Sequence, residues 1–505
     1  MNVRKLLLQR AQEHSKRCAF VFQDKMISFL ELKDTSFSLA SFLIKEGIGS
    51  SERVAIFLPN IPETIYSFLG TFSIDAVVVP LDYMLTEEEI INFINHSEAK
   101  ALIMRPKKGI DVVNIKKQCP SLKTVITVEE RIEGVFFWDD VIESADTSLA
   151  DVGHNEDALS SIFYTSGSTG HPKGVMLSYK HFNNPCQCID YFLHISEKDV
   201  FLCGGVPFSH IGGLDYILLM LYFGAKMVLM ERFSPYDFLK NIEKYKVTLF
   251  WIVPAMYVAI LSLKDYTKFD LASLRYSVVF GAPSSPLLLR RFHKACPRAY
   301  LLNGWGMTET AAPNCILPPG MDKVESIGKF YPGMQAKVVD EDGKELGAQK
   351  QGELWVKGEG VMLGYYKEPQ LTEEVLTPEG WLKTGDIAYY DKDGLFYIVG
   401  RKKDMIKVAG EIVFSTEVEE KIHRYPKVKE VAVVGVRDKM RGEVPKAFVV
   451  AKEGESIDED ELKEFLKEHL AHFKIPHYFE FVDQLPKTRT GKIDKKPLII
   501  EGNPR

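Results

Sequence analysis

The first chemistry that the sequence offers is phosphate binding, by a stretch of small and hydroxylated residues in the first half of the chain. An apolar run over 159–164, typical of a strand, leads into this stretch, and Lys173 follows it. Glycine lets the backbone approach a ligand closely, while hydroxyl and N–H groups are donors for phosphate oxygens. We expect the loop to wrap a polyphosphate, with Lys173 as counter-charge. Its other predicted ligands are Thr165, Ser166, Gly167, Ser168, Thr169 and Gly170.

Two other interpretations of this loop have to be weighed. A flexible linker would also be rich in Gly and Ser, but linkers rarely carry His-Pro-Lys followed by an apolar run such as 175–177. A Walker A loop requires Gly-Lys-Ser/Thr, whereas His171 follows Gly170 here and Gly174 follows Lys173. If the loop binds phosphate, it therefore does so by another scheme.

Two later loops each follow a predicted strand, at 276–280 and at 300–302. Ligands of open α/β sheets bind outside the carboxyl ends of the strands, so both loops could contact a nucleotide. Trp305 offers an aromatic face to a base, and Thr308 with Glu309 could hold a magnesium ion that bridges phosphates. The alternative is an ordinary helix cap. The candidate residues are Gly281, Ala282, Pro283, Asn303, Gly304, Trp305, Gly306, Met307, Thr308 and Glu309.

Four single residues complete the candidate set, and each also has a plainer explanation. Asp386 follows a Thr-Gly turn, where it could accept hydrogen bonds from ribose hydroxyls or simply be a turn residue. Arg401 could be a second ribose or phosphate partner, or part of a solvated basic run. His210 precedes two glycines, so something passes close to the backbone there, although a lone histidine is more often structural. Lys492 lies in a basic tail that, by itself, would be solvated.

These residues need a scaffold, and the apolar pattern predicts an α/β fold. Between 28 and 128 helices alternate with strands, and Ser28 and Thr86 each stand three residues before a glutamate, the spacing of a capping box. Continuous apolar runs at 54–58 and 76–81 suit strands that are buried on both faces of a mainly parallel sheet. Further strands are expected at 226–230, 247–253, 276–280 and 300–302.

The pattern changes beyond about residue 332. Turn signals at 340–343 and 391–394 separate short alternating runs, which indicates a small antiparallel sheet. After Gly400 we expect an α+β unit with a helix at 416–423, strands at 431–436 and 446–450, and a helix capped by Ser456. The predicted domains are therefore 1–400 and 401–505.

Composition excludes several classes of protein. The 505 residues are 46% apolar and 26% charged, as in soluble globular proteins, and a net charge of −6 gives no sign of nucleic-acid binding. An odd count of seven scattered cysteines suits free thiols in a reducing compartment. The most apolar stretch, 214–230, is better explained as a buried helix, a Gly stop and a strand than as a membrane span. We expect a cytoplasmic protein, with peripheral membrane contact left open.

The order and spacing of these motifs resemble the adenylate-forming superfamily over nearly the whole chain, from about 28 to 498. This superfamily includes acyl-CoA synthetases, peptide-synthetase adenylation domains and luciferases. The resemblance implies an α/β fold with two mostly parallel sheets and a small antiparallel β subdomain in a large N-terminal domain, followed by a small mobile α+β C-terminal domain that acts as a lid. It also implies ATP and Mg²⁺ as cofactors and coenzyme A as co-substrate.

The resemblance also assigns roles to the candidates. The loop over 165–174 would hold the β- and γ-phosphates of ATP, 281–283 would line the adenine, and Gly304 with Trp305 would cover its other face. The remaining implied roles are the α-phosphate for Thr308, magnesium for Glu309 and Thr165, the ribose for Asp386 and Arg401, the α-phosphate and attacking carboxylate for Lys492, the acyl substrate for His210, and the pantetheine tunnel for the segment from Lys407 to Gly410.

The implied reaction has two steps. A carboxylate attacks the α-phosphorus of ATP to give acyl-AMP and pyrophosphate, and the thiol of coenzyme A then takes the acyl group. In the family the small domain rotates between these steps, about a hinge at the position of Lys403.

Three residues depart from the family pattern. Asp75 stands where Gly is usual, Ser415 replaces a common Pro, and Ile412 stands where coumarate ligases and luciferases carry Gln. An apolar residue after Gly410-Glu411 is closer to fatty acyl-CoA synthetases. We therefore expect a medium- or long-chain fatty acid as substrate, lying along 208–214, 279–280 and 305–307.

Rival functions stay open at this stage. They are an aryl– or other carboxylate–CoA ligase, and an enzyme that loads a carrier-protein phosphopantetheine. A non-catalytic nucleotide-binding protein is disfavoured because all the charged candidates are present. The chain could be a monomer or a homodimer.

Overall fold

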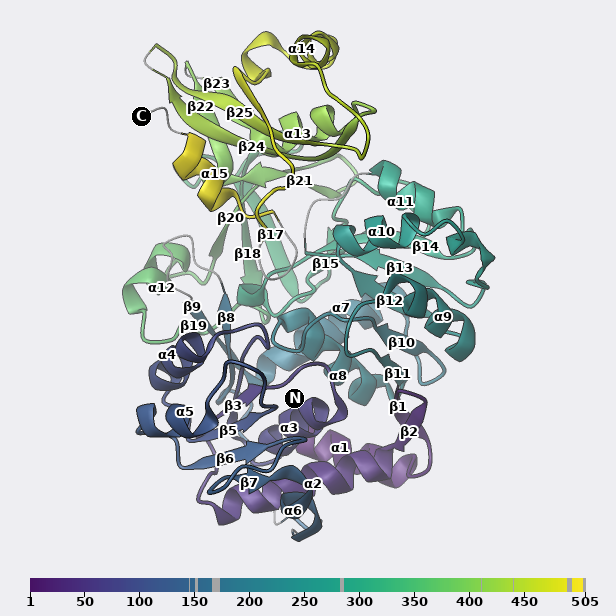
Figure 1. Cartoon of the computed structure of the whole chain (residues 1–505), viewed down its shortest axis with the longest axis vertical. Coiled ribbons are helices and arrows are strands. Elements are labelled where there is room, and N and C mark those ends of the chain that lie inside the picture. Colours follow the sequence, from purple (N-terminus) through teal and green to yellow (C-terminus); the bar gives the residue numbers. More distant parts are fainter. Residues whose placement is uncertain are drawn as a thin grey trace. The chain divides into compact units, whose positions relative to one another are not determined.

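A computed structural model describes residues 1–144, 146–149, 153–165, 173–281, 286–409, 411–438, 440–487 and 493–502. The chain folds into two compact units (Figure 1). The first unit comprises Met1–Gln335 and Lys357–Leu382, and the second comprises Ala336–Val356 and Lys383–Arg505.

One mostly parallel sheet of the first unit carries the predicted base-binding loops. Its inner strands pair in parallel, while β2, β15 and β16 are added in antiparallel orientation at its two ends. The strands that the sequence predicts at 226–230, 247–253, 276–280 and 300–302 are all present. In spatial order the sheet consists of β16 (Lys329–Phe330), β15 (Cys315–Ile316), β14 (Tyr300–Trp305), β13 (Tyr276–Val279), β12 (Leu249–Ile252), β10 (Val200–Cys203), β11 (Lys226–Leu229), β1 (Cys18–Phe22) and β2 (Lys25–Ser28).

A second mostly parallel sheet of the same unit carries the predicted phosphate loop. The apolar runs at 54–58 and 76–81, which the sequence predicts as buried strands, form β3 and β4. These two strands are buried and pair in parallel. At one end of the sheet β9 pairs antiparallel with β8, and β19 pairs antiparallel with β9. In spatial order the sheet consists of β19 (Gly364–Tyr365), β9 (Lys173–Ser178), β8 (Leu159–Thr165), β4 (Val77–Pro80), β3 (Arg53–Phe57), β5 (Ala101–Met104), β6 (Thr124–Thr127) and β7 (Phe136–Phe137).

Helices connect and cover these sheets; α9 packs on β10 and α11 on β14, and α10 contacts both helices (Figure 1). The helices of the first unit are α1 (Val3–Glu13), α2 (Phe29–Lys45), α3 (Pro62–Phe72), α4 (Glu87–Ser97), α5 (Val112–Gln118), α6 (Trp138–Ser144), α7 (Asn183–Leu193), α8 (Ile211–Phe223), α9 (Pro235–Tyr245), α10 (Pro254–Leu261), α11 (Pro286–His293) and α12 (Pro369–Val375), with 3-10 turns η1 (Tyr179–Phe182), η2 (Tyr266–Lys268) and η3 (Thr308–Thr310).

Several local predictions are confirmed. Ser28 and Thr86 cap α2 and α4, and in each case the glutamate of the capping box reaches back to the cap backbone. The apolar stretch from 214 folds as the buried helix α8, which ends at Gly224 with φ +65 before β11 begins. Glycine accepts this left-handed conformation without the penalty that a Cβ would bring.

The second unit contains two smaller sheets, apart from strand-end residues of one of them that group with the first unit: Met334, Gln335, Lys357, Gly358 and Leu382. One is the four-strand sheet of β17 (Met334–Val339), β18 (Gly352–Gly358), β20 (Leu382–Tyr390) and β21 (Phe396–Arg401), in which β20 and β21 pair antiparallel. The other contains β23 (Glu411–Phe414), β22 (Met405–Val408), β25 (Gly442–Ala451) and β24 (Val428–Asp438), with β26 (Tyr478–Phe481) against β25. The helical elements of this unit are η4 (Lys402–Asp404), α13 (Ser415–His423), α14 (Glu459–Lys467), η5 (His472–Lys474) and α15 (Lys495–Gly502).

The predicted Ser456 cap of α14 is wrong. The N-cap is Asp458, whose carboxylate accepts hydrogen bonds from the backbone N–H groups of Asp460 and Glu461, both at 3.0 Å. A carboxylate satisfies two of the free N–H groups at once, and its charge favours the positive end of the helix. The helix therefore begins two residues later than a serine cap would place it.

All seven cysteines are free thiols of the first unit; Cys18 is half-buried and the other six are buried. No helix in the described part of the chain is both long enough and apolar enough to cross a bilayer.

Candidate active site

The strands β8 and β9 fix both ends of the predicted phosphate loop. Tyr164 faces Gly174 and Thr165 faces Lys173 in their antiparallel register, so the loop begins and ends on one pair of neighbouring residues. Both Thr165 and Lys173 are half-buried. The predicted ligands Ser166, Gly167, Ser168, Thr169 and Gly170 lie outside the described residues. The fold thus presents Thr165 and Lys173 side by side at the same end of two neighbouring strands.

Aromatic side chains anchor the two ends of this loop. The hydroxyl of Tyr164 lies 2.7 Å from Nδ1 of His96 on α4, and the N–H of Tyr366 donates to the carbonyl of Gly174 at 2.7 Å. The His96 ring also packs edge-on against both tyrosine rings. Burial, and then the nearby charge of Lys367, lower the pKa of His96. A neutral imidazole can accept the hydrogen bond of the Tyr164 hydroxyl, so this anchor suits neutral pH.

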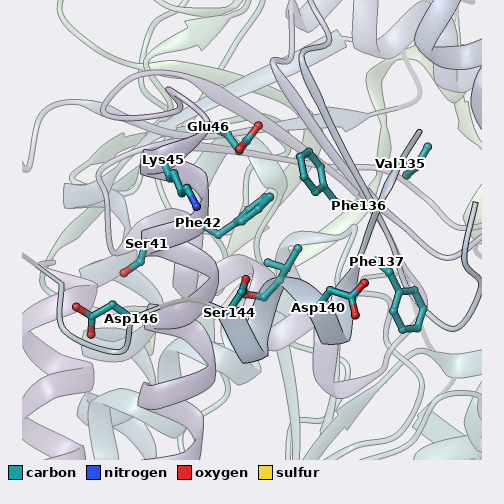
Figure 2. Close-up of a pocket in the computed structure, with 11 residues that line it drawn as sticks. Ser41, Phe42, Lys45, Glu46, Val135, Phe136, Phe137, Asp140, Ser144 and Asp146 are labelled. Carbon is teal, nitrogen blue, oxygen red and sulfur yellow. The ribbon is translucent and has the colours of Figure 1, made fainter. Parts of the chain in front are cut away.

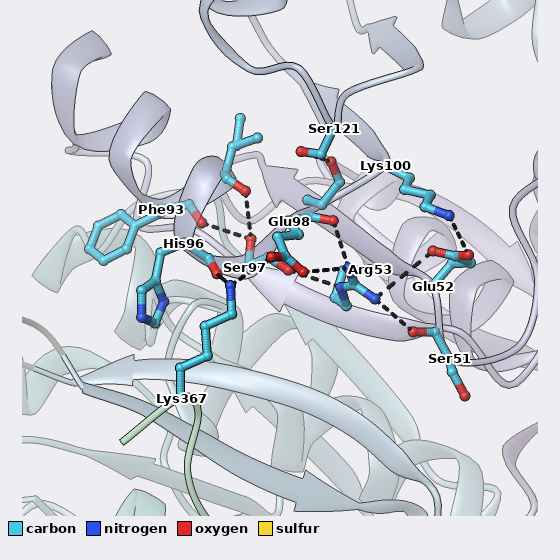
Figure 3. Close-up of polar contacts among 12 residues, drawn as sticks. Ser51, Glu52, Arg53, Phe93, His96, Ser97, Glu98, Lys100, Ser121 and Lys367 are labelled. Atoms are coloured by element: carbon cyan, nitrogen blue, oxygen red, sulfur yellow. Dashed lines mark hydrogen bonds and ion pairs between the residues drawn. The ribbon is translucent and has the colours of Figure 1, made fainter. Parts of the chain in front are cut away.

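A polar network holds the chain just after β19 (Figure 3). The Lys367 ammonium donates to the His96 carbonyl and to the Glu98 carboxylate, both at 2.9 Å, at the end of α4. Arg53 of β3 donates to the carbonyls of Ser97 and Glu98 at 2.9 and 3.0 Å. Exposed ion pairs of this kind are worth below about 1 kcal/mol each, but together they fix the position of the segment.

Tyr365 brings together the two charged residues that the sequence predicts for phosphate and magnesium. Its hydroxyl donates to Glu309 Oε1 at 3.0 Å, and Lys173 Nζ lies 5.0 Å from the centre of its ring. Burial and the negative charge of Glu309 raise the pKa of Tyr365, which keeps the phenol a donor. Tyr365 was not predicted as a site residue. Its only sequence signal is an aromatic pair that follows Gly364.

The donor set around Glu309 fits magnesium. Glu309 is half-buried, and within the described residues its carboxylate forms no ion pair and its second oxygen accepts no hydrogen bond. The described part of the chain holds no cluster of three His, Cys, Asp or Glu residues that could bind a metal alone. Magnesium prefers one or two carboxylates and completes its shell with phosphate oxygens and water. Glu309 and the Thr165 hydroxyl, both hard oxygen donors, match that requirement.

The predicted base-binding loops leave adjacent parallel strands. Gly281 follows β13 with φ +85, and Val279 faces Asn303 of β14. A Cβ on Gly304 would lie 1.9 Å from the Phe280 ring, so the glycine is needed for this close contact. Ala282 and Pro283 lie outside the described residues.

The indole of Trp305 is largely covered. Its ring packs on Phe330 with centroids 5.6 Å apart, and the residue is 8% exposed. This favours the backbone around Trp305, rather than its face, as a surface for a base. The following residues turn tightly: a Cβ on Gly306 would meet Ala312 at 2.5 Å, and the Met307 N–H donates to Thr310 at 3.1 Å. Thr308 and Glu309 then form the 3-10 turn η3.

His210 stands at the start of α8, with its side chain 42% exposed and Nε2 3.9 Å from an oxygen of Asp82. The two glycines after it have different surroundings. A Cβ on Gly213 would lie 2.2 Å from the Pro207 carbonyl, so the group that passes close is the chain's own backbone. The Gly212 carbonyl accepts a hydrogen bond from the Trp251 indole at 3.1 Å. His210 is thus exposed above a tightly packed helix start.

In the second unit, Asp386 and Arg401 form an ion pair across β20 and β21. They face each other in the strand register, and Arg401 Nε lies 2.7 Å from Asp386 Oδ1. The Asp386 side chain is 3% exposed, whereas that of Arg401 is 45% exposed. Thr384 supports the turn: its hydroxyl donates to the Leu354 carbonyl at 2.7 Å and accepts from the Asp386 N–H at 3.1 Å. The two predicted ribose ligands are therefore brought together.

The remaining predictions concern the C-terminal part of this unit. Lys407 is exposed on β22, and its N–H donates to Glu443 at 3.0 Å. Ser415 begins α13, and its hydroxyl accepts a hydrogen bond from Lys495 at 2.9 Å, a contact that the Pro common in the family could not make. Gly410 and Lys492 lie outside the described residues.

A separate pocket of about 450 Å³ lies between α2, β7 and α6 (Figure 2). None of the predicted site residues that the structure describes lines it. The rings of Phe42 and Phe136 meet edge to face within it, 4.9 Å apart.

Comparisons with known proteins identify the family to which the chain belongs. Residues 7–366 match the family described as AMP-binding enzyme, and residues 417–492 match the AMP-binding enzyme C-terminal domain. The chain is 31% identical to a long-chain-fatty-acid–CoA ligase of Bacillus subtilis (strain 168), over 98% of this chain and 94% of that protein.

Two solved structures are similar over nearly their whole length. One is an anthranilate–CoA ligase in complex with anthranoyl-AMP, with a TM-score of 0.91, 27% identity and coverage of 100% of this chain and 97% of that one. The other is ATP-bound MatB from Rhodopseudomonas palustris, with a TM-score of 0.91, 29% identity and coverage of 99% of both chains.

Proposed function

As a member of the AMP-binding enzyme family, the chain is an AMP-forming acyl-CoA synthetase, and we propose that its acid substrate is a medium- or long-chain fatty acid. ATP would be the second substrate and the thiol of coenzyme A the acceptor. The reaction would take place in the cytoplasm.

The observation that carries the adenylating chemistry is the shared contact of Lys173 and Glu309 with Tyr365. Lys173, the cation for the departing pyrophosphate, lies over the ring of Tyr365. Glu309, the carboxylate for a magnesium ion, accepts the hydrogen bond of its hydroxyl. Phosphoryl chemistry needs such opposed charges close together, because ATP and an attacking carboxylate repel each other.

In the first half-reaction a carboxylate oxygen forms a bond to the α-phosphorus, and the bond from that phosphorus to the bridging oxygen breaks. Lys173 would bind the β- and γ-phosphates that leave as pyrophosphate. Thr308 and Lys492 would contact the α-phosphate, and Asp386 with Arg401 would bind the ribose. When bound at Glu309 and Thr165, magnesium would neutralise phosphate charge.

In the second half-reaction a thiol attacks the carbonyl carbon of the mixed anhydride, and AMP leaves. The segment that begins at the exposed Lys407 would contact the pantetheine arm. His210 would border the acyl group during both steps. Holding the reacting groups at a fixed distance and angle can lower the activation free energy of such two-substrate reactions by about 7–11 kcal/mol at most.

Two observations support an aliphatic acid as the substrate. The apolar Ile412, 44% exposed, continues the pattern of fatty acyl-CoA synthetases, and the long-chain-fatty-acid–CoA ligase aligns over 98% of the chain. A second candidate, an aryl acid, is favoured by the similarity to the anthranilate–CoA ligase. Loading of a carrier-protein phosphopantetheine is the third.

The test is pyrophosphate release across a panel of fatty and aromatic acids, each with and without coenzyme A. We expect release with medium- or long-chain fatty acids and formation of the thioester when coenzyme A is present. Release with aromatic acids alone would overturn the fatty-acid assignment. Acyl-AMP that accumulates and is not consumed by coenzyme A would point to a carrier protein as acceptor.

A further inference from the structure

Tyr365 holds a position that neither the motifs nor the proposed reaction explain. Its phenol donates to the Glu309 carboxylate at 3.0 Å, while the Lys173 ammonium lies 5.0 Å from its ring centre. The residue is only 7% exposed. A buried phenol needs an acceptor, and within the described residues Glu309 is the one that Tyr365 has.

The backbone around Tyr365 is firmly attached to the same site. Its N–H donates to Thr372 at 2.9 Å, and in the register of β19 and β9 it faces Val175, two residues after Lys173. The N–H of Met362 donates to the Glu309 carbonyl at 2.9 Å. The segment is therefore bonded to the strand of Lys173 on one side and to the turn of Glu309 on the other.

The network of Figure 3 extends this attachment beyond the strand. Lys367, two residues after Tyr365, donates to the His96 carbonyl and to the Glu98 carboxylate at the end of α4. Tyr366 donates its N–H to Gly174. The chain is thus held in place both before and after Tyr365.

Lys173 and Glu309 form no ion pair with each other in the described structure, although Tyr365 contacts Lys173 through its ring and Glu309 through its hydroxyl. Opposite charges at such close range would attract each other strongly in a partly buried site. If they paired directly, each would lose the charge that a nucleotide and its metal require. The phenol leaves one oxygen of Glu309 without a hydrogen bond, and the ring binds Lys173 without removing its charge.

We propose that Tyr365 is a positioning residue that keeps Lys173 and Glu309 separate and oriented, so that both charges are available to magnesium-bound ATP. The inference rests on the proposed function, because it presupposes that ATP and magnesium bind here. Tyr365 acts through Glu309 and Lys173 and is not assigned a contact with substrate.

The test uses two matched variants of the full chain. Tyr365→Phe removes the hydroxyl and keeps the ring next to Lys173. Tyr366→Phe makes the same chemical change one residue later, where the hydroxyl has no hydrogen bond in the described structure, and it keeps the ring against His96 and the N–H that donates to Gly174. ATP affinity is measured by calorimetry without acid, in excess Mg²⁺ and in EDTA, and thermal melts verify folding.

In the wild type, Mg²⁺ should tighten ATP binding. In Tyr365→Phe this gain should shrink about ten- to a hundredfold, the effect of one hydrogen bond to a charged group, with affinity in EDTA unchanged within about twofold. The Mg²⁺ concentration for half-maximal pyrophosphate release should rise in parallel, and excess Mg²⁺ should restore the rate. Tyr366→Phe should match the wild type throughout.

Three results would overturn the inference. An undiminished Mg²⁺ gain in Tyr365→Phe would show that the hydroxyl does not orient Glu309, with the proposed function intact. An equal loss of ATP affinity in Mg²⁺ and in EDTA would indicate a general structural role. Absence of any Mg²⁺ gain in the wild type would remove the proposed function, and the inference with it.

Discussion

Arg401 Nε lies 2.7 Å from Asp386 Oδ1, and the two residues face each other across β20 and β21. The carboxylate is buried and the guanidinium is half exposed, so the arginine compensates a charge that would otherwise be costly inside the unit. A buried, oriented carboxylate is well suited to accept hydrogen bonds from two vicinal hydroxyls.

The function of the Asp386–Arg401 pair should be weakened even by a substitution that keeps the positive charge of Arg401. Arg401→Lys retains a cation but loses the planar donor set that contacts Asp386 and Thr384, so we expect the KM for ATP to rise about five- to tenfold. The measurement is pyrophosphate release against ATP concentration. Lys402→Met is the control, because it removes a neighbouring cation whose ion pair is with Glu353 and not with Asp386. An unchanged KM in Arg401→Lys would contradict the ribose assignment.

Lys492 should matter for one half-reaction only. If it neutralises charge on the attacking carboxylate and α-phosphate, Lys492→Ala should slow acyl-AMP formation about 100-fold or more, as loss of a transition-state donor does. Thiolysis of supplied acyl-AMP should be unaffected. Lys487→Ala is the control, since Lys487 pairs with Glu430 at 2.8 Å. Normal acyl-AMP formation in the Lys492 variant would show that the assigned role is wrong.

Asp215 should make stability depend on pH. The residue is 3% exposed within α8, and among the described residues its Oδ1 has no hydrogen-bond partner. Burial raises the pKa of Asp215, so the folded state retains a proton that the unfolded chain loses near the ordinary pKa. Between these two pKa values the free energy of unfolding falls as pH rises, by up to about 1.4 kcal/mol per pH unit.

Asp215→Asn removes this titration. Urea unfolding between pH 5 and pH 8 should show the variant gaining stability relative to the wild type as pH rises. The difference between the two proteins isolates Asp215 from other titrating groups. A difference that stays constant over this range would contradict the predicted proton retention.

Substitutions of Asp75 should test why the family usually has glycine at this position. Its φ of +53 is left-handed, and its carboxylate lies 2.9 Å from His154 Nδ1 and accepts the Asn155 N–H at 3.1 Å. Both Asp75→Gly and Asp75→Ala lose these contacts, but only alanine adds a Cβ to left-handed backbone. We expect Asp75→Ala to be less stable than Asp75→Gly by about 1 kcal/mol in urea unfolding. The reverse order would rule out backbone strain as the reason.

Much of the fold could be predicted because its signals are local. Continuous apolar runs such as 54–58 mark strands buried on both faces, and capping boxes at Ser28 and Thr86 mark helix starts. Asp458 was missed as a cap because Ser456 and Asp458 are both good N-caps, and the choice depends on where α14 packs. The domain boundary near Gly400 stays a prediction; by compactness, 336–356 and 383–400 group with the second unit.

The site was predictable only where a motif carries the chemistry. Asp386 and Arg401 were identified separately, and their pairing follows from a strand register that sequence does not display. The covered ring of Trp305 depends on Phe330, which is distant in sequence. Tyr365 was missed because an aromatic residue beside a glycine is common in cores, and its role appears only when β19 lies against β9.

The burial of the cysteines has a practical consequence for chemical labelling. Six thiols are shielded and the half-buried Cys18 can be changed to serine, while none of the seven lies in the second unit. Met440 of that unit is 94% exposed, so Met440→Cys would offer a maleimide dye one accessible thiol on the folded protein. A fluorophore placed there would report, in real time, any reorientation of the second unit during turnover.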